Sequence, residues 1–514
     1  MTSDIEDNPY NVCFIGAGFV GATTAAVLAL KNPSTQFTVV DNDRGRIAAW
    51  NSMELPVQEP GLLEIVQSVS HWHAACVGSK IVSPESNNCV DGQPTHDKFN
   101  PQRNQSNVRN QEVCVSMHSK PNLRFSTDIR EAIRTADMLF ITVNTPSKMS
   151  PMEHEWDLSY FDAVLELVID ASMGSTIIVE KSTVPCGNAL RISQMVQSKA
   201  EPNKSFTILS NPEFLSAGSA VADLLDPYSV VIGSPSSTPR SDPNTLSLVR
   251  LYDSWIPDER IRLMSTSSSE LVKIANNAFE AQRISSINSL TVLCERLGAN
   301  IKDISHSLGM NPNIGPRFLQ AGVGFGGSCL RKDTLGLSGI ATDISMPEVA
   351  DYWRQVVVIN DFQVQRFTKR VCQYASESPS RDVAILGFAF KKDTNDPRNS
   401  IAKDVILALL SQGANVALHD PLVSADAIRS LLPPAHEVQI CRTPYEACQG
   451  AETIAILNDS KEYTDLDWNR ISANMEGKKR VVVDGRDVID AGRLAGLGLI
   501  VEKLGKPSHM DGIM

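Results

Sequence analysis

The sequence lacks features typical of membrane, secreted and zinc-binding proteins. It contains no run of about 18 apolar residues, so we expect no membrane-spanning helix. Its first residues, MTSDIEDNPY, are acidic and polar, which is unlike a signal or transit peptide. Its 10 cysteines include no CxxC pair, so we expect reduced thiols rather than disulfides or zinc ligands. These absences together favour a cytoplasmic protein.

An excess of positive charge is also missing. The chain has 47 basic and 59 acidic residues, a net charge of −12 and a pI near 5.3. This balance argues against a broad nucleic-acid surface, but a few local Arg and Lys residues can still hold a small anionic ligand. With 514 residues and 42% apolar content, the chain is expected to form two or three globular domains.

The first part of the chain carries a dinucleotide-binding pattern. An apolar segment at 11–15 leads into the turn GAGFVG, and a helical segment follows at 22–31. A second apolar segment, 37–40, ends at Asp41, 20 residues after the last glycine of the turn. Such glycines let a pyrophosphate approach the helix N-terminus, and the acid favours NAD over NADP because it accepts from ribose hydroxyls. Because Arg44 and Arg46 follow nearby, the preference for NAD over NADP is less well defined than the dinucleotide class of the cofactor.

Polar turns follow three further apolar segments. The pairs are 138–143 with Asn144-Thr145-Pro146, 176–179 with 180–185, and 206–209 with 210–213. Ligands of open α/β sheets bind beyond the carboxyl ends of the strands, so we expect these turns at one edge of a sheet.

The segment 70–120 shows no sustained periodicity and is rich in Asn, Gln, Ser and Pro. We interpret it as a surface insertion or a flexible loop. We expect no metal site there, because no zinc pattern is formed by its candidate ligands His71, His73, Cys76, Cys89, His96 and Cys114.

A long helix is expected at 267–297, with Ser268 and Ser269 as possible caps. Lys273 and Asn277 are four residues apart on it and therefore project from one face. A helix of this length suggests a spine between domains or a subunit interface.

A glycine-rich loop, GVGFGGSCLRKD, follows at 322–333 and places Cys329 behind four glycines. Asp333 lies one helical turn beyond the cysteine if this segment is helical. Such a loop can close over a small ligand, whereas the alternative is a mobile loop with an incidental thiol. A further helix is expected at 348–371, with Pro347 at its start.

The α/β alternation recurs in the last third of the chain. Apolar segments are expected to form strands at 382–386, 415–418, 451–457 and 480–483, with a helix at about 400–411. No full GxGxxG is present, and Lys391, Arg398 and Arg486 follow the predicted strands. These cations suit phosphates or carboxylates better than a second dinucleotide.

This combination resembles the UDP-glucose 6-dehydrogenase family, within the wider nucleotide-sugar dehydrogenases. The matching pieces run in the family's order over nearly the whole chain: GAGFVG, VNTP, EKSTVP, NPEFL, KIANNAFEAQRISSIN, GFGGSC…KD, GFAFKKDTNDPR and VVDGR. The resemblance implies an NAD-dependent oxidation of UDP-glucose to UDP-glucuronate in two hydride transfers. It also implies two Rossmann-like doubly wound domains joined by a long central helix and a helical dimerisation segment, in a homodimer or larger homo-oligomer.

The resemblance implies domains at 1–240 for NAD, 241–370 for dimerisation and the cysteine loop, and 371–514 for the UDP-sugar. The implied catalytic residues are Cys329, Lys273, Asp333, Asn277, Glu213 and Thr183. The cofactor-binding residues are Gly16, Gly18, Phe19, Val20, Gly21, Asp41, Arg46, Asn144, Thr145, Pro146, Ser182 and Arg398. The substrate-binding residues are Phe214, Leu215, Phe318, Gly322, Phe325, Gly326, Phe390, Lys391 and Arg486.

The chain departs from the family's pattern at three places. Ala217 stands where an acid usually follows NPEFL, and Asn313 replaces an arginine that animal members direct at a neighbouring subunit's sugar. Asn458-Asp459-Ser460 replaces the usual Thr-Glu-Trp. The departures favour two alternatives: a dehydrogenase of another nucleotide sugar, such as a UDP-N-acetylhexosamine, or a non-catalytic paralogue that regulates an active partner.

Overall fold

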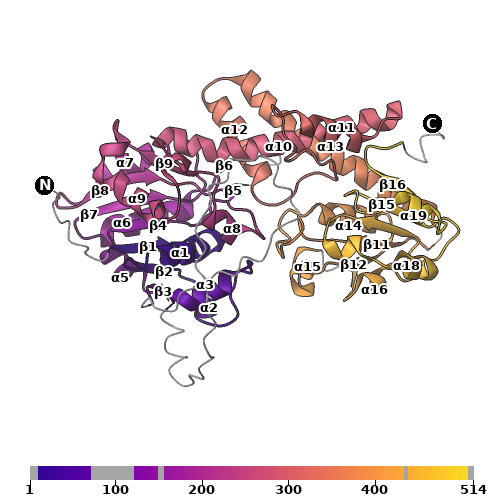
Figure 1. Ribbon diagram of the computed structural model, residues 1–514, viewed down its shortest axis with the longest axis horizontal. Helices are drawn as coiled ribbons and strands as arrows, with labels where there is room; N and C mark the ends of the chain where they lie inside the picture. Colours follow the sequence, from indigo (N-terminus) through magenta and orange to yellow (C-terminus); the bar gives the residue numbers. More distant parts are fainter. Residues whose placement is uncertain (1–9, 71–120, 149–154, 379, 433–437, 508–514) are drawn as a thin grey trace, which may run out of the picture. The chain divides into compact units, whose positions relative to one another are not determined.

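The computed structural model describes residues 10–70, 121–148, 155–378, 380–432 and 438–507 (Figure 1). Apart from Ser70, the predicted insertion at 70–120 lies outside this range. The chain divides into two compact units. The first holds Met1–Asn144, Ser159–Ser182 and Gly187–Ser269, and the second holds Thr145–Leu158, Thr183–Cys186 and Glu270–Met514.

The first unit is built on an eight-stranded sheet, counted over the described residues. All its neighbouring strands are parallel except β8 and β9, and their order across the sheet is β10 (Ile261–Ser265), β9 (Val230–Ser234), β8 (Ser205–Ser210), β7 (Ser175–Glu180), β4 (Met138–Ile141), β1 (Asn11–Ile15), β2 (Gln36–Val40) and β3 (Leu123–Ser126). The chain reverses its direction across the sheet between β1 and β4, which is where ligands bind in doubly wound folds.

Helices cover both faces of this sheet, so its strands are apolar on both sides. Phe14 and Phe140 stack at 4.3 Å between ring centroids on the face that α1, α3, α8 and α9 cover. The helices of the unit are α1 (Phe19–Lys31), α2 (Arg44–Trp50), α3 (Leu62–Val69), α5 (Ile129–Arg134), α6 (Ser159–Ala171), α7 (Asn188–Lys199), α8 (Ala220–Leu225) and α9 (Pro243–Asp253), with 3-10 turns η1 (Pro239–Ser241) and η2 (Asp258–Arg260).

The long predicted helix is α10 (Thr266–Leu297), which leads from the first unit into the second. Its predicted caps were wrong, because Ser268 and Ser269 lie inside the helix. Ser265 receives the Ser268 backbone N–H at 3.3 Å and caps it instead. Residues 265–269 are five consecutive hydroxyl residues, so the sequence does not show which of them caps the helix.

The second unit continues with α11 (Ile301–Met310), α12 (Leu330–Asp343) and α13 (Pro347–Glu377), which begins at the predicted proline and ends two turns later than expected. It also contains a short antiparallel pair, β5 (Ser147–Lys148) and β6 (Glu155–Trp156). No helix among the described residues is long and apolar enough to cross a membrane.

The C-terminal part of the second unit is a parallel sheet of six strands within the described residues. The strands lie in the order β13 (Val438–Ile440), β12 (Asn415–His419), β11 (Asp382–Leu386), β14 (Thr453–Ile456), β15 (Val481–Asp484) and β16 (Ile500–Lys503). Its helices are α14 (Ile401–Ser411), α15 (Ala425–Leu431), α16 (Pro444–Cys448), α17 (Lys461–Thr464), α18 (Trp468–Asn474) and α19 (Ala491–Ala495). Alternate strand residues face two separate apolar cores, as in a second doubly wound fold. The predicted α/β class with two Rossmann-like parts and a long central helix is confirmed.

Candidate functional site

The glycine turn after β1 has the close packing that a dinucleotide site needs. Gly16 has φ +113°, and a Cβ on Gly21 would lie 2.2 Å from the Gly16 carbonyl oxygen, so no side chain fits at either position. Gly18 precedes α1 without a side-chain cap, and a Cβ there would meet nothing within 4 Å. The first N–H groups of α1 are therefore open to an anion, and the turn fits a pyrophosphate.

The predicted ribose acid Asp41 is held beside this turn. Its Oδ2 accepts from Ala17 N and from Arg46 Nη1, both at 2.9 Å, and its Oδ1 accepts from Asp43 N at 2.9 Å. Asp41 is buried, whereas the Arg46 side chain is 42% exposed. The structure thus brings both predicted residues to the glycine turn and fixes the direction of the carboxylate.

The polar turn after β8 also follows its strand as predicted. Glu213 Oε2 accepts from Leu215 N at 2.6 Å, and the Phe214 ring lies 5.6 Å from the Tyr228 ring. After β7, Ser182 Oγ donates to the Val143 carbonyl at 2.7 Å, which joins this turn to the one after β4. These turns extend the carboxyl edge of the first sheet beyond the glycine turn.

In the second unit, Cys329 precedes α12 and is exposed. The Asp333 N–H donates to the Cys329 carbonyl at 2.9 Å, which confirms the helical turn expected between the two residues. The sulfur lies 3.6 Å from Ser328 Oγ. The thiol is thus accessible at the start of a helix.

Asp333 lies behind this cysteine and is fully buried. Asn277 Nδ2 of α10 donates to Asp333 Oδ2 at 2.6 Å, across 56 positions of sequence. Lys273 is also buried, one turn before Asn277 on the same helix. Three of the predicted catalytic residues therefore sit in the interior, where charge interactions are stronger than in water.

Lys332 belongs to the same cluster, although no sequence pattern marks it as a site residue. Its Nζ lies 3.7 Å from Asp333 Oδ1, donates to the Thr145 carbonyl at 3.3 Å and stands 4.8 Å from the centre of the Trp156 ring. Thr145 Oγ1 in turn donates to the Thr183 carbonyl at 2.6 Å. In the sequence, the signal that could have pointed to Lys332 is its position beside Asp333, in the KD pair after the cysteine.

The glycines before Cys329 pack against the segment that follows β11. A Cβ on Gly326 would lie 2.5 Å from the Asn399 carbonyl oxygen, and one on Gly327 would lie 2.8 Å from the Phe390 ring. Asn399 Nδ2 donates to the Gly327 carbonyl at 3.2 Å. The loop therefore needs glycine for close approach, and the predicted substrate residue Phe390 lies directly against it.

Two other predicted substrate residues, Phe325 and Phe318, differ from each other in burial. Phe325 is buried in a small core with Ala278, Trp353 and Val356, and its backbone bonds to the Asn360 side chain. Phe318 is 43% exposed and has φ +60°, a strained conformation for a bulky residue.

Three predicted cations surround the cysteine loop and the β11 exit. Arg486 Nη1 lies 3.1 Å from the position of a Cβ on Gly322, and burial lowers the pKa of its guanidinium although Asp459 and Asp484 oppose this effect. Hydrogen bonds to Asp396 raise the pKa of Arg398, with a smaller contribution from nearby Cys329. Lys391 Nζ lies 5.8 Å from the centre of the Phe390 ring.

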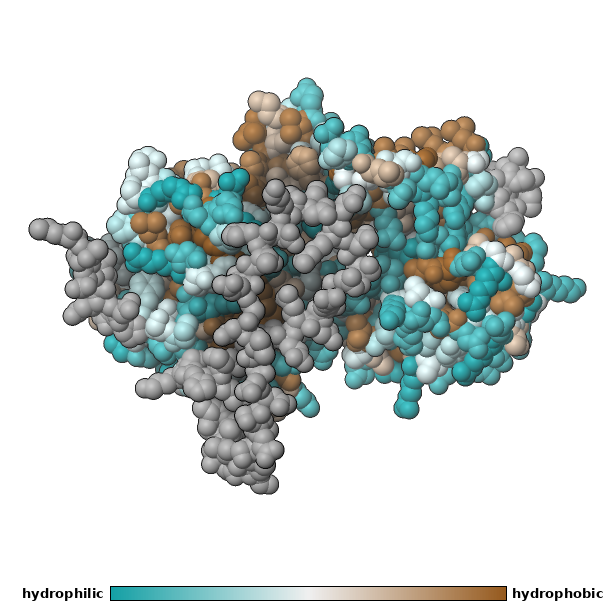
Figure 2. Space-filling model, viewed as in Figure 1, coloured by the Kyte–Doolittle hydropathy of each residue, from teal (hydrophilic) through white to brown (hydrophobic). Residues whose placement is uncertain are grey.

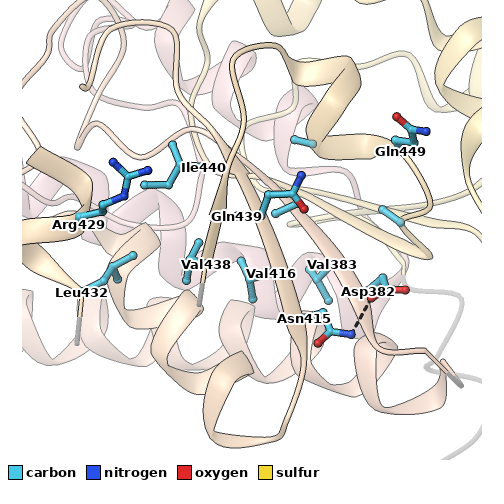
Figure 3. A pocket seen from close by; sticks show the side chains of 13 residues that line it. Asp382, Val383, Asn415, Val416, Arg429, Leu432, Val438, Gln439, Ile440 and Gln449 are labelled. Carbon is cyan, nitrogen blue, oxygen red and sulfur yellow. Dashed lines mark hydrogen bonds between the residues drawn. The ribbon is translucent and has the colours of Figure 1, made fainter. Parts of the chain in front are cut away.

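Two cavities of the second unit differ in their relation to this cluster. One of about 1150 Å³ is lined by Gly326, Gly327, Ser328 and Arg398 as well as by α13 and α14. The other, of about 750 Å³, opens at the amino ends of β11, β12 and β13, where Asn415 donates to Asp382 at 2.8 Å (Figure 3). Ligands of parallel sheets bind at the opposite edge, and the first cavity adjoins the cysteine loop through Gly326, Gly327 and Ser328. No metal-binding cluster of three or more His, Cys, Asp or Glu occurs among the described residues.

Comparisons with known proteins match all three parts of one family. The model of the UDP-glucose/GDP-mannose dehydrogenase family, NAD binding domain, matches residues 10–78 and 99–256, the central domain matches 267–362, and the UDP binding domain matches 384–491. A UDP-glucose 6-dehydrogenase 1 of Glycine max is 40% identical, covering 96% of this chain and 97% of its own. A UDP-glucose 6-dehydrogenase of Drosophila melanogaster is 38% identical, covering 98% of both chains.

Solved structures share the fold. A UDP-glucose dehydrogenase from the hyperthermophilic archaeon Pyrobaculum islandicum superimposes with a TM-score of 0.76 at 26% identity, covering 98% of this chain and 99% of its own. A UDP-D-ManNAc dehydrogenase from Pyrococcus horikoshii, at 21% identity, has a TM-score of 0.73 over 96% of this chain and 99% of its own, which supports the fold alone.

Proposed function

The chain belongs to the UDP-glucose/GDP-mannose dehydrogenase family, and from this premise we propose that it oxidises UDP-glucose to UDP-glucuronate. Membership of the family makes it an NAD-dependent nucleotide-sugar dehydrogenase with a UDP-sugar substrate. The choice of glucose is the proposal, and the identity to UDP-glucose 6-dehydrogenases over nearly the full chain carries it.

The glycine turn after β1, Asp41 and Arg46 would hold NAD, together with Asn144, Thr145, Pro146, Ser182 and Arg398. When bound there, NAD would supply the hydride acceptor for the two oxidations. Asp41 would accept from a ribose hydroxyl, because neighbouring N–H donors already fix its direction. The open N-terminus of α1 would receive the pyrophosphate.

Cys329 would be the nucleophile. Its thiolate would attack the aldehyde carbon, the carbonyl electrons would move to oxygen, and a thiohemiacetal would form. Loss of a hydride would leave a thioester, and water would then release the carboxylate and regenerate the thiol. This route keeps the aldehyde bound between the two oxidations, because the carbon stays attached to the chain.

The buried groups behind Cys329 would stabilise the developing negative charge and orient the hydrolytic water. Lys273 and Asn277 would stabilise the oxyanion of the tetrahedral intermediates, since a buried cation and an amide donor favour negative charge on oxygen. Asp333 would orient the hydrolytic water, with Glu213 and Thr183 assisting. The hydrogen bond between Asn277 and Asp333 supports placing the two residues in the same site. Phe390, Lys391 and Arg486, with the glycine loop, would hold the UDP-sugar.

A panel of UDP-sugars tests the proposal, with NADH absorbance and NADH per sugar as the readouts. We expect turnover of UDP-glucose with two NADH formed per sugar and UDP-glucuronate as product. Turnover of a UDP-N-acetylhexosamine but not of UDP-glucose would instead support the alternative that Asn313 and Ala217 favour. Binding of UDP-glucose without NADH from any sugar would support a non-catalytic paralogue.

A further inference from the structure

The last strand of the second sheet ends in a buried lysine. The Lys503 side chain is 6% exposed, and its Nζ lies 2.5 Å from Asp487 Oδ1 and 3.5 Å from Asp484 Oδ2. It also donates to the Ile489 carbonyl. An ammonium group is buried only where partners compensate for its lost hydration, so the positions of these partners show what the lysine holds.

All three partners lie in one turn, residues 484–489, which begins at the last residue of β15. Within it, Asp484 Oδ1 accepts from Arg486 N and Asp484 Oδ2 from Ile489 N, both at 3.0 Å. Asp487 has φ +54°, which is uncommon outside glycine. Burial alone would raise the pKa of the Asp487 carboxyl, but hydrogen bonds from Lys503 and Lys302 lower it below its ordinary value. The lysine therefore fixes an ionised, conformationally strained turn at three points.

This turn carries Arg486 to the cysteine loop. Arg486 Nε donates to the Leu457 carbonyl at 2.9 Å, and its Nη1 lies 3.1 Å from the position of a Cβ on Gly322. A Cβ on Gly485 would lie 2.3 Å from the Val323 side chain. The turn and the start of the loop are thus in close contact, and a displacement of the turn would move Arg486.

We propose that Lys503 is a positioning residue, which holds the 484–489 turn so that Arg486 meets the UDP-sugar. The inference rests on the proposed role of Arg486 in substrate binding. Lys503 itself is buried behind the turn and acts through its contacts with Asp484, Asp487 and the Ile489 carbonyl.

The test compares Lys503→Met with a control at the same carboxylate. In Lys503→Met, and in the double variant with Asp487→Asn that also removes the partner charge, we expect KM for the UDP-sugar to rise about tenfold because Arg486 is misplaced. We expect kcat within about twofold and an unchanged KM for NAD. The control Lys302→Met removes an exposed ammonium 3.1 Å from Asp487 Oδ2 and should leave all three constants unchanged.

Three results would overturn the inference. One is an unchanged KM for the UDP-sugar, and another is an equal loss in kcat and in both KM values. The third is failure of both Lys503→Met and its double variant with Asp487→Asn to fold, since Lys503 would then serve stability alone. An Arg486→Ala variant, measured in parallel, separates the two proposals. If KM for the UDP-sugar is unchanged in Arg486→Ala, the proposed role of Arg486 is wrong. If KM for the UDP-sugar rises in Arg486→Ala but is unchanged in Lys503→Met, only the proposed role of Lys503 is wrong.

Discussion

Individual side chains of the cysteine cluster differ in how they can respond to substrate. Cys329 is exposed and free to reach a ligand, whereas Asp333, Asn277 and Lys273 are buried and held by the surrounding protein. Groups that are already oriented require little reorganisation when charge develops on a substrate oxygen. The thiol is thus the accessible group in the proposed reaction, and the buried groups support it.

Replacing the thiol tests its proposed role. In Cys329→Ala we expect UDP-glucuronate formation to fall by at least about a thousandfold, because no thioester can form. Product would be measured by NMR alongside NADH. The control Cys441→Ala removes a buried thiol whose pKa is raised by burial and by Glu446, and it should stay active. Normal UDP-glucuronate output from Cys329→Ala would refute the thioester route.

His419 at the end of β12 makes stability depend on pH. Burial lowers the pKa of its imidazole below the ordinary 6.5, although nearby carboxylates, Glu462 first among them, oppose this shift. Between the folded and unfolded pKa values, the unfolded chain binds more protons, so stability falls as pH drops below about 6.5.

We therefore expect the free energy of unfolding to decrease between about pH 7 and pH 5, with a smaller slope in His419→Gln. Urea titrations at several pH values would measure it. Because the ring also contacts the Tyr463 hydroxyl at 3.2 Å, the variant should be less stable at every pH. An identical slope in both proteins would contradict the assignment.

At the scale of elements, the two nucleotide-binding folds differ in the turn after their first strand. In the first unit, α1 begins at Phe19, close behind Gly16, and its N-terminus is uncapped by a side chain. In the second, Asp420 Oδ2 accepts from Phe388 N at 2.7 Å and Ala389 N at 2.8 Å, and α14 begins only at Ile401. Asp41 also accepts from one N–H of the first turn, that of Ala17, so the later start of α14 is the difference that disfavours a pyrophosphate, as expected from the missing GxGxxG.

The cysteine loop offers a test of close packing as distinct from backbone conformation. Gly327 has φ +80° and would place a Cβ 2.8 Å from the Phe390 ring, whereas Gly174 has φ +90° with nothing within 4 Å. We expect both alanine variants to lose about 1–2 kcal/mol of stability from the left-handed backbone. Only Gly327→Ala should also lose activity, by about tenfold to a hundredfold in kcat/KM, because Cys329 and Phe390 would shift. Equal activity in the two variants would show that this contact does not position the site.

At the scale of the whole molecule, the second unit exposes an apolar surface at the tip where α12 and α13 meet (Figure 2). Ile344, Met346, Val349 and Tyr352 are 63%, 51%, 47% and 55% exposed. Contiguous exposed apolar surface marks interaction sites, and a second copy of the chain is the occupant that the predicted dimerisation segment implies.

For the homo-oligomer that the sequence predicts, we expect Val349→Lys with Tyr352→Lys to lower the mass in solution, because two cations on the tip oppose burial. Light scattering after size exclusion would measure the mass. The matched control Tyr160→Lys changes a tyrosine that is 61% exposed in the first unit, and it should leave the assembly intact. An unchanged mass in the double variant would place the interface elsewhere.

The fold class and the position of the glycine turn could both be predicted from the sequence. These features depend on local pattern: β1 and β11 have their predicted bounds, and Asp333 lies one helical turn after Cys329 as its spacing implied. Local pattern failed where several residues of one type competed, as at the cap of α10, and at some element ends, as at the end of α13.

Which distant residues meet depends on how the chain packs in three dimensions. Asn277 bonds to Asp333 across 56 positions, Lys332 to the Thr145 carbonyl across 187, and Lys503 to the turn that carries Arg486. Such contacts depend on how helices and strands pack, and the residues that make them carry no periodic signal of their own. For that reason the place of Lys332 in the cluster and the role proposed for Lys503 came from the structure, whereas the roles of Cys329, Lys273 and Asp333 came from the sequence and its resemblance.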